Sequence, residues 1–458
     1  MTTLAAHGLR VAPGRSARAH VAALPALRPA LVIRSALLLL VIGNLGRVPI
    51  GSLAAKDAPI LFNDILVLAV LATGFVAALR SRALRIDLPA LLALVFGAVG
   101  ALSAVLGAAR FGLTGIQLVF SLAYLARWLA YFGIYLVAIN TLRPADVPSI
   151  WRALEATILA FAVFGIVQSI FLPGFAQLVY PEMGWDIQGR RLVSTLLDPN
   201  FAGGLVVIGL LVVLARIAMG ISERPWKPLV LVTALLLTLS RSSFAAFALG
   251  CVVILAARGI SRRFLRLAGA VAALSLPFLP ALLDLARAYN KLGIDASALG
   301  RLESWLRGVT VFADNPVLGV GFNTYGFVQR AYGWDLGGMA RFGLDGGLLF
   351  IAVMTGLVGL ALYLGMVGSV VHRCRRTWRD GTRSAEDRGL AIGVAAATVA
   401  MLVHSVFVNS LLFPFIMEAL WVLWALTFVA RRPEPGNGPS ADGLVVASFT
   451  SAVRDGRR

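Results

Sequence analysis

Long apolar runs constrain the fold of this chain more than any other feature of its sequence. An apolar run of about 20 residues is long enough to cross the hydrocarbon core of a bilayer as an α-helix. Such runs lie at residues 31–50, 58–79, 88–108, 115–139, 149–171, 199–219, 226–240, 242–257, 263–283, 346–371, 389–409 and 413–430. Because 59% of the 458 residues are hydrophobic and only 14% are charged, a water-soluble fold could not bury so much apolar surface. We therefore expect an all-α membrane protein with about twelve transmembrane helices.

The basic residues form short clusters between the apolar runs and no continuous basic face. The formal net charge of +19 therefore predicts no nucleic-acid partner. The clusters instead follow the positive-inside rule, by which Lys and Arg gather in cytoplasmic loops. If the N-terminus is inside, clusters such as 80–85 and 373–388 are cytoplasmic, whereas the short outer loops are poor in Lys and Arg. The rule predicts two cytoplasmic termini and places the long connections 172–198 and 284–345 outside.

The chain divides into three predicted parts. Residues 1–30 lack the compact apolar core of a signal peptide, so we expect a disordered basic cytoplasmic tail. Residues 31–432 would form the transmembrane domain. Residues 433–458 are rich in Gly, Pro and Ser and would form a second disordered cytoplasmic tail. Two cysteines in unrelated segments and four histidines without zinc-type spacing predict neither a disulfide framework nor a metal site.

The larger outer loop, 284–345, contains an amphipathic pattern. Leu302, Trp305, Leu306 and Val309 recur at the i, i+3, i+4 and i+7 spacing of one helix face. Such a face suits the boundary between lipid and water. We therefore expect a helix that lies on the outer membrane surface.

Five arginines lie on the outer side against the positive-inside rule: Arg190, Arg191, Arg241, Arg301 and Arg307. A guanidinium group pairs with phosphate through two parallel hydrogen bonds. An anionic ligand at the outer leaflet would therefore account for these residues. Ordinary lipid headgroups or solvated loop charges are the alternative explanation for any one of them.

Two predicted helix starts point to the same outer side. Asp198 can cap a helix that begins at Pro199, and the positive end of that helix would add to the charge of the nearby arginines. Asp198 and Asn200 are thus candidates for the same anion site, although a well-capped helix is the simpler explanation. Asp345, which precedes Gly346, is either a helix cap or a carboxylate base at the outer mouth.

Five ionisable residues lie inside the apolar runs: Asp64, Arg127, Glu155, His404 and Glu418. A charge is costly in lipid, so these side chains should face the interior of the bundle or water. For His404, a hydrogen-bonded core residue is a more common role than a catalyst.

Five stretches, taken in order, resemble the O-antigen ligase and O-antigen polymerase superfamily of bacterial envelope proteins. They are Arg191–Asn200, Thr238–Ser243, Gly300–Trp305, Asn315–Phe322 and Thr355–Gly359. No stretch is specific alone, and the resemblance depends on their order and their shared outer placement. Together they span roughly residues 190–360, and the twelve-span layout extends the resemblance over most of the chain.

The resemblance implies a GT-C-like fold in the bacterial inner membrane, with the active site in the periplasm. It implies metal-independent transfer, without a cofactor, of a glycan from undecaprenyl pyrophosphate to the hydroxyl of a polysaccharide or lipid acceptor. The family's pyrophosphate-binding arginines would correspond to Arg191 and Arg241, with Arg301 as a third, catalytic candidate. Arginines can neutralise a pyrophosphate leaving group without a metal.

One position departs from the family pattern. Ligases of the family carry a His-Asn pair about eleven residues before the glycine that corresponds to Gly356, and this chain has Asp345 and Gly346 there. Asp345 could still accept the proton of an acceptor hydroxyl. The departure favours a polymerase of O-antigen or exopolysaccharide, which would work with a chain-length regulator. The alternatives are a ligase that uses the lipid A core or another acceptor, and, in another class, a transporter or flippase.

Overall fold

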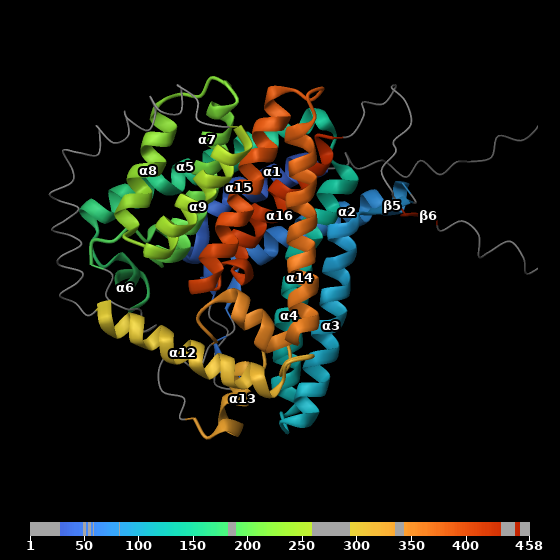
Figure 1. Cartoon of the computed structure of the whole chain (residues 1–458), viewed down its shortest axis with the longest axis vertical. Coiled ribbons are helices and arrows are strands. Elements are labelled where there is room, and N and C mark those ends of the chain that lie inside the picture. The colour runs from blue at the N-terminus through green and yellow to red at the C-terminus, as the bar shows by residue number, and fades with distance from the viewer. Residues whose placement is uncertain are drawn as a thin grey trace, which may run out of the picture.

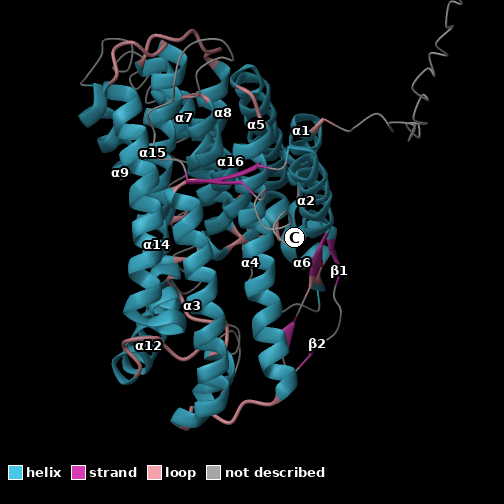
Figure 2. Cartoon of the chain, turned by 90° about the vertical axis from the view of Figure 1, so that its right-hand side faces the viewer, coloured by secondary structure: helices cyan, strands magenta, loops and turns pink. Residues whose placement is uncertain are grey.

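The computed structural model describes residues 28–48, 52–53, 56–57, 59–81, 83–181, 189–258, 294–334, 343–431 and 445–448. These residues form a helical bundle in which almost all regular structure is α-helix (Figures 1 and 2). Most of the predicted tails, the predicted span 263–283 and parts of the loop 284–345 lie outside the described residues.

Within the described residues, nine helical segments are long and apolar enough to cross a membrane. They are α1 (Pro29–Leu39) with the 3-10 turn η1 (Leu40–Gly46), α2 (Phe62–Ser81), α3 (Leu88–Arg110), α4 (Gly115–Thr141), α5 (Val147–Phe171) with the preceding turn η2 (Pro144–Asp146), α7 (Pro199–Ala218), α9 (Arg241–Arg258), α14 (Gly347–Arg379) and α15 (Ala385–Phe407). Two shorter apolar helices are α8 (Trp226–Thr238) and α16 (Pro414–Val429). Each coincides with a predicted span, so the chain is a multi-pass membrane protein.

The other described elements are one long helix, α12, and several short ones. They are α6 (Phe175–Val179), η4 (Ser194–Leu196), α12 (Ile294–Asp314), α13 (Tyr325–Val328), η6 (Gln329–Tyr332) and η8 (Ser410–Leu412), with the antiparallel strand pairs β1 (Arg47–Val48) and β4 (Ile60–Leu61), β2 (Ser52–Leu53) and β3 (Lys56–Asp57), and β5 (Ala83–Ile86) and β6 (Val445–Ser448). The last pair joins part of the predicted C-terminal tail to the connection between α2 and α3. For residues 445–448, the structure thus has a strand where the sequence predicted disorder.

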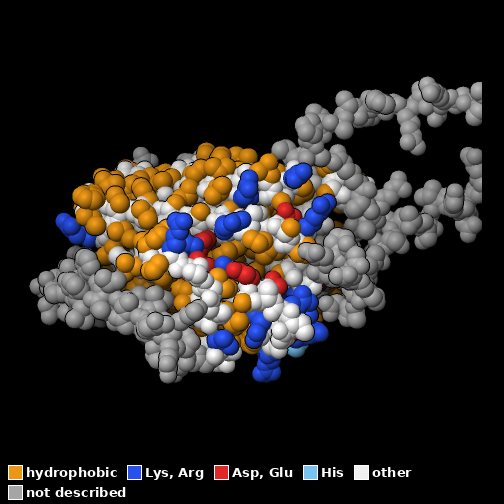
Figure 3. Space-filling view, turned by 90° about the horizontal axis from the view of Figure 1, so that it is seen from above, with side chains coloured by type: hydrophobic (Ala, Val, Ile, Leu, Met, Phe, Trp, Pro, Cys, Tyr) orange, Lys and Arg blue, Asp and Glu red, His pale blue; other side chains and the backbone are white. Residues whose placement is uncertain are grey.

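The bundle has two chemically different ends. At one end, here called the α12 end, α12 lies across the bundle near the starts of α7, α9 and α14 (Figures 1 and 2). At the opposite, basic end, Lys and Arg side chains gather on the surface (Figure 3). On α12, the residues Leu302, Leu306 and Val309 are more than half exposed, which fits the predicted amphipathic helix.

Helix α7 forms the centre of the bundle. Every residue from Ala202 to Ala215 is buried, and α7 packs against α15, α8 and α9. A helix that is apolar on all sides belongs in such a position, because it has no polar face to present to water. Gly203 lets α9 approach closely, since a Cβ atom there would overlap the side chain of Ser243. The starts of α7 and α9 are therefore held side by side.

Helix α14 is broken at Gly356, where φ is 65° and ψ is −167°. The loop that follows α12 fills the break: Val320 N donates to Val353 O at 2.9 Å, and Leu357 N donates to Pro316 O at 2.8 Å. These bonds replace helical bonds that the kink removes, as a backbone buried away from water requires. Two of the stretches singled out in the sequence, Asn315–Phe322 and Thr355–Gly359, thus pack together at the break in α14.

We expect Gly356→Ala to lower the stability of the protein by about 1–3 kcal/mol, because only glycine adopts this backbone conformation without strain. The new Cβ would also overlap the carbonyl oxygen of Val317. The matched control is Gly368→Ala in the same helix, where a Cβ meets nothing within 4 Å. That change should stabilise the helix by about 0.5–1 kcal/mol. Thermal unfolding of the purified variants measures both, and equal melting temperatures would contradict the strain at Gly356.

Candidate functional site

The segment before α7 is fixed to the end of α8. Leu192 N donates to Leu237 O at 2.9 Å, and Arg191 Nε donates to Thr238 O at 2.9 Å. Arg191 is 5% exposed, so its guanidinium group lies inside the protein next to the turn that leads into α9. Arg191 and Arg241, which were predicted to serve one site, therefore flank the same turn.

Gln168, near the end of α5, holds the same segment from the other side. Its Oε1 accepts from Val193 N at 3.0 Å and from Ser194 N at 3.1 Å, while its Nε2 donates to Arg191 O at 3.3 Å. Gln168 was not among the site residues predicted from the sequence. A lone amide side chain within an apolar run was the only available sign, because an amide is buried there only with partners.

A buried polar network links the starts of α7 and α9 to α15. Ser240 Oγ donates to Asn200 Oδ1 at 2.9 Å and accepts from Ser243 N at 3.3 Å, so it also caps α9. His404 Nε2 lies 3.1 Å from Ser243 Oγ, and its Nδ1 contacts Ser410 Oγ. His404 is fully buried and bonded at both ring nitrogens, so it is the hydrogen-bonded core residue that the sequence favoured.

A cavity of about 410 Å³ opens between α12 and the adjacent ends of α9 and α15. Its described lining consists of Arg241, Ser242, Ala245, Arg301, Leu302, Trp305 and Phe407. The cavity thus combines two guanidinium groups with an apolar wall. We call it the α12 pocket.

Two carboxyl groups lie within electrostatic reach of the α12 pocket. Burial raises the pKa of the Asp198 carboxyl, while the N–H groups of Phe201 and Asn200 and the charges of Arg191 and Arg301 oppose this shift. Asp345 is an exposed residue, yet protein atoms crowd its carboxyl and this partial burial raises its pKa. The Arg301 charge lowers the pKa of Asp345 and the Asp198 charge raises it further. Arg301 therefore interacts electrostatically with both carboxyl groups.

Asp345 is not the cap of α14. The helix begins at Gly347 after Gly346, with no side-chain cap hydrogen bond. Asp345 N instead donates to Ser304 Oγ on α12 at 3.0 Å, and the preceding Leu344 O accepts from Asn409 Nδ2 at 2.7 Å. The loop that carries Asp345 is thus held between α12 and the end of α15.

The other predicted residues have clear places. Asp198 caps α7, because its Oδ1 accepts from Asn200 N at 2.7 Å and Phe201 N at 3.0 Å. Asn200 takes part in the buried polar network through Ser240. Arg190 is exposed, and its described contact is a backbone one, in which its carbonyl oxygen accepts from Ser169. Among the described residues that line the α12 pocket, Arg241 and Arg301 are the predicted arginines.

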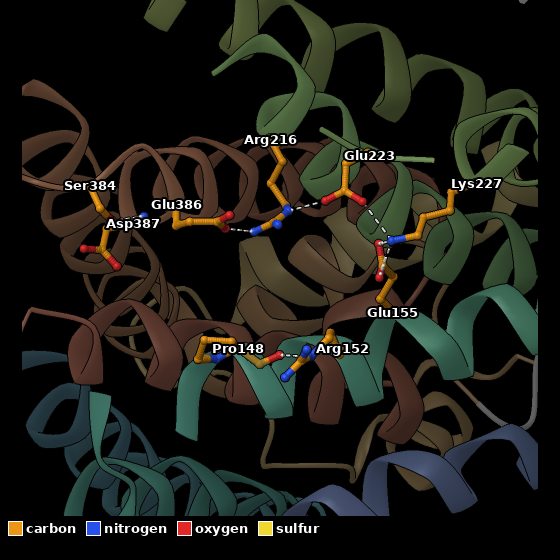
Figure 4. Close-up of polar contacts among 9 residues, drawn as sticks. All are labelled: Pro148, Arg152, Glu155, Arg216, Glu223, Lys227, Ser384, Glu386 and Asp387. Atoms are coloured by element: carbon orange, nitrogen blue, oxygen red, sulfur yellow. Dashed lines mark hydrogen bonds and ion pairs between the residues drawn. The ribbon is translucent and has the colours of Figure 1, made fainter. Parts of the chain in front are cut away.

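The remaining intramembrane charges face partners in the bundle, as expected. At the basic end, Glu155 binds Lys227 at 2.8 Å, and a chain of ion pairs continues through Glu223 and Arg216 to Glu386 (Figure 4). These groups lie far along α5 and α7 from the α12 pocket, so they stabilise the opposite end of the bundle.

Residues 229–364 match the family model for O-Antigen ligase. This match confirms the resemblance to the O-antigen ligase and polymerase superfamily. The matched region contains most of α8, all of α9 and α12, and the kink of α14, hence four of the five stretches recognised in the sequence. It includes Arg241, Arg301 and Asp345, whereas Arg191 and Asp198 precede it. No curated protein matches the chain.

The capping role of Asp198 gives a prediction. Asp198→Ala should lower the stability by about 1 kcal/mol, because two N–H groups of α7 lose their acceptor, whereas Asp198→Asn should retain most of it. Thermal unfolding of the two variants measures the difference. An equal loss in both would mean that the negative charge, and not the cap, stabilises this end of α7.

Proposed function

We propose that the chain is a GT-C-type glycosyltransferase of the bacterial inner membrane that uses an undecaprenyl-pyrophosphate-linked glycan as its donor. The match to the O-antigen ligase model supports a ligase or polymerase role. In this proposal the α12 pocket faces the periplasm, and the basic end faces the cytoplasm in accordance with the positive-inside rule.

The composition of the α12 pocket is the observation that carries the proposal. Arg241 and Arg301 suit the two phosphates of the donor, since guanidinium binds phosphate oxygens in a fixed geometry. Leu302, Trp305 and Phe407 suit the first isoprene units of its lipid. Trp305 Nε1 is buried and has no hydrogen-bond partner within the described part of the chain, so it can serve as a further donor.

The starts of α7 and α9 add to this positive potential, because the amino ends of both helices carry partial positive charge. During transfer, the acceptor hydroxyl attacks the anomeric carbon of the glycan and the bond to the pyrophosphate oxygen breaks. Negative charge then develops on the leaving pyrophosphate, where Arg241 and Arg301 would stabilise it. Asp345 would accept the proton of the acceptor hydroxyl. Arg191 would contribute its charge while it holds the turn between α8 and α9.

Polymerisation is the leading form of the proposal, because Asp345 and Gly346 replace the His-Asn pair that the family's ligases carry. A ligase is the second candidate, and the description of the matching model favours it. Purified protein with a lipid-linked repeat unit separates the two: longer lipid-linked chains indicate a polymerase, and transfer only to a core acceptor indicates a ligase. Movement of the donor across vesicles without a new product would indicate a transporter instead.

We expect Arg241→Ala and Arg301→Ala each to weaken the binding of undecaprenyl pyrophosphate by about tenfold or more, since a lost charge-assisted hydrogen bond costs about 1.5–3 kcal/mol. Binding to the purified protein in detergent measures this. Arg307→Ala is the matched control on the same helix, because Arg307 is engaged with Glu303 and the ring of Trp334. Unchanged binding in both pocket variants would remove the diphosphate from the α12 pocket.

Asp345 provides a separate test of the chemistry. As the base it must be ionised, so transfer by the wild type should fall as the pH drops through the raised pKa of Asp345. Asp345→Asn should lower the transfer rate by about 100-fold or more and leave donor binding intact. Initial rates measured across the pH range check both expectations. An asparagine variant with the wild-type rate would exclude Asp345 as the base.

A further inference from the structure

A second polar cluster lies between α2, α4 and α16, apart from the residues of the α12 pocket. Arg127 forms an ion pair with Asp64, and Tyr131 OH donates to Asp64 Oδ1 at 3.1 Å. Asn63 Nδ2 donates to Tyr131 OH at 3.3 Å and also to Glu418 Oε2. The cluster therefore connects Glu418, deep in the bundle, to the partly exposed pair of Asp64 and Arg127.

The two carboxyl groups of this cluster are in unequal positions. Asp64 has a cation as its partner and also accepts from Leu61 N at 2.9 Å. Glu418 is 1% exposed, and its described hydrogen bond comes from the neutral amide of Asn63. The cluster thus contains two carboxyl groups but only one guanidinium group among its described residues. If both were ionised, the cluster would carry a net negative charge inside an apolar bundle, which is strongly unfavourable.

The Asn63 side chain shows where a proton is needed. Asn63 is 3% exposed, and its Oδ1 is buried with no hydrogen-bond partner in the described structure. An amide oxygen in this position should receive a hydrogen bond. One carboxyl oxygen of Glu418, Oε2, already accepts from the nitrogen of the same amide. A proton on the other carboxyl oxygen would supply the donor that Asn63 Oδ1 lacks.

We propose that Glu418 is a neutral carboxylic acid in the folded protein, joined to Asn63 by two hydrogen bonds. Its O–H donates to Asn63 Oδ1, and Asn63 Nδ2 donates to Oε2. The proton is taken up from solvent when the chain folds. The cluster then contains one positive and one negative charge, and each buried polar atom of the Asn63 amide is bonded.

The groups that could change this state lie on the neighbouring helices. Asp64 faces the pair from α2, and Tyr131 and Arg127 face it from α4. On α14 and α15, the described side-chain hydrogen bonds of Tyr363, His404 and Arg373 go to Leu411 O, to Ser410 and Ser243, and to Asp87 and Trp424 O, and none of them goes to Glu418. The charged residues of α5 and α7 lie toward the basic end of the bundle.

The pair has a consequence for the α12 end, because α16 supports the start of α7. The ring of Phe413, just before α16, stacks on Phe201 of α7 with centroids 3.8 Å apart and planes 9° from parallel. Glu418 lies about one helical turn into α16. The neutral pair thus fixes α2 to α16, and α16 to α7. Glu418 does not line the α12 pocket, so its role is that of a positioning residue.

The test compares two buried glutamates in the full-length protein. Glu418→Gln replaces a neutral acid by a neutral amide of the same shape, and should not lower the melting temperature at neutral pH. The infrared difference between wild type and this variant should contain the carbonyl band of a protonated carboxyl group. Glu155→Gln is the matched control, since Glu155 is paired with Lys227. It should lower the melting temperature and remove a carboxylate band instead.

The pH dependence of stability gives an independent measurement. A glutamate that is neutral when folded and ionised when unfolded makes the folded state bind one more proton, so stability falls as pH rises above about 4.3. Glu418→Gln removes this contribution and should gain stability relative to wild type as pH rises. A destabilised Glu418→Gln variant, or the loss of a carboxylate band in it, would overturn the proposal. Neither measurement requires glycan transfer, so the result is independent of the proposed function.

Discussion

The hydrogen bond from Arg191 Nε to the carbonyl oxygen of Thr238 is the contact on which the α12 end depends. It ties the segment before α7 to the end of α8, and the turn that follows sends α9 back through the bundle beside α7. Without this bond, the carbonyl oxygen of Thr238 would lose the donor that Arg191 supplies inside the bundle. The positive ends of two helices are consequently fixed next to Arg241 and the α12 pocket.

The long helices could be predicted because an apolar run in lipid satisfies its backbone groups almost only as a helix. The break in α14 could not. In the sequence Gly356 resembles any small residue of a transmembrane helix. Its conformation depends on hydrogen bonds that the backbone of α14 forms with Pro316 and Val320, which are distant from Gly356 in the chain. Such bonds are set by tertiary contact and leave no periodic pattern.

The end of the bundle that holds the candidate site could be predicted from the sequence, but the detailed contacts of its residues could not. Charge distribution brought Arg241 and Arg301 to one end, and they line one cavity. Arg191 is buried and binds a backbone carbonyl oxygen, a structural role that the sequence did not predict, because a guanidinium group can bind a carbonyl oxygen as well as a phosphate. Gln168 was missed because a single amide has no spacing partner in the sequence.

The kink of α14 connects α12, which carries Arg301, to the segment that carries Asp345. The loop that fills it begins directly after α12, the helix that carries Arg301, and its bonds to Leu357 and Val353 hold the loop at Pro316 and Val320. The segment of α14 before the kink begins two residues after Asp345, whose N–H is bonded to Ser304 of α12. Hydrogen bonds therefore join the backbone segments that carry Arg301 and Asp345 at two places, at the kink of α14 and at Ser304. This arrangement can hold a cation and a carboxylate at constant separation.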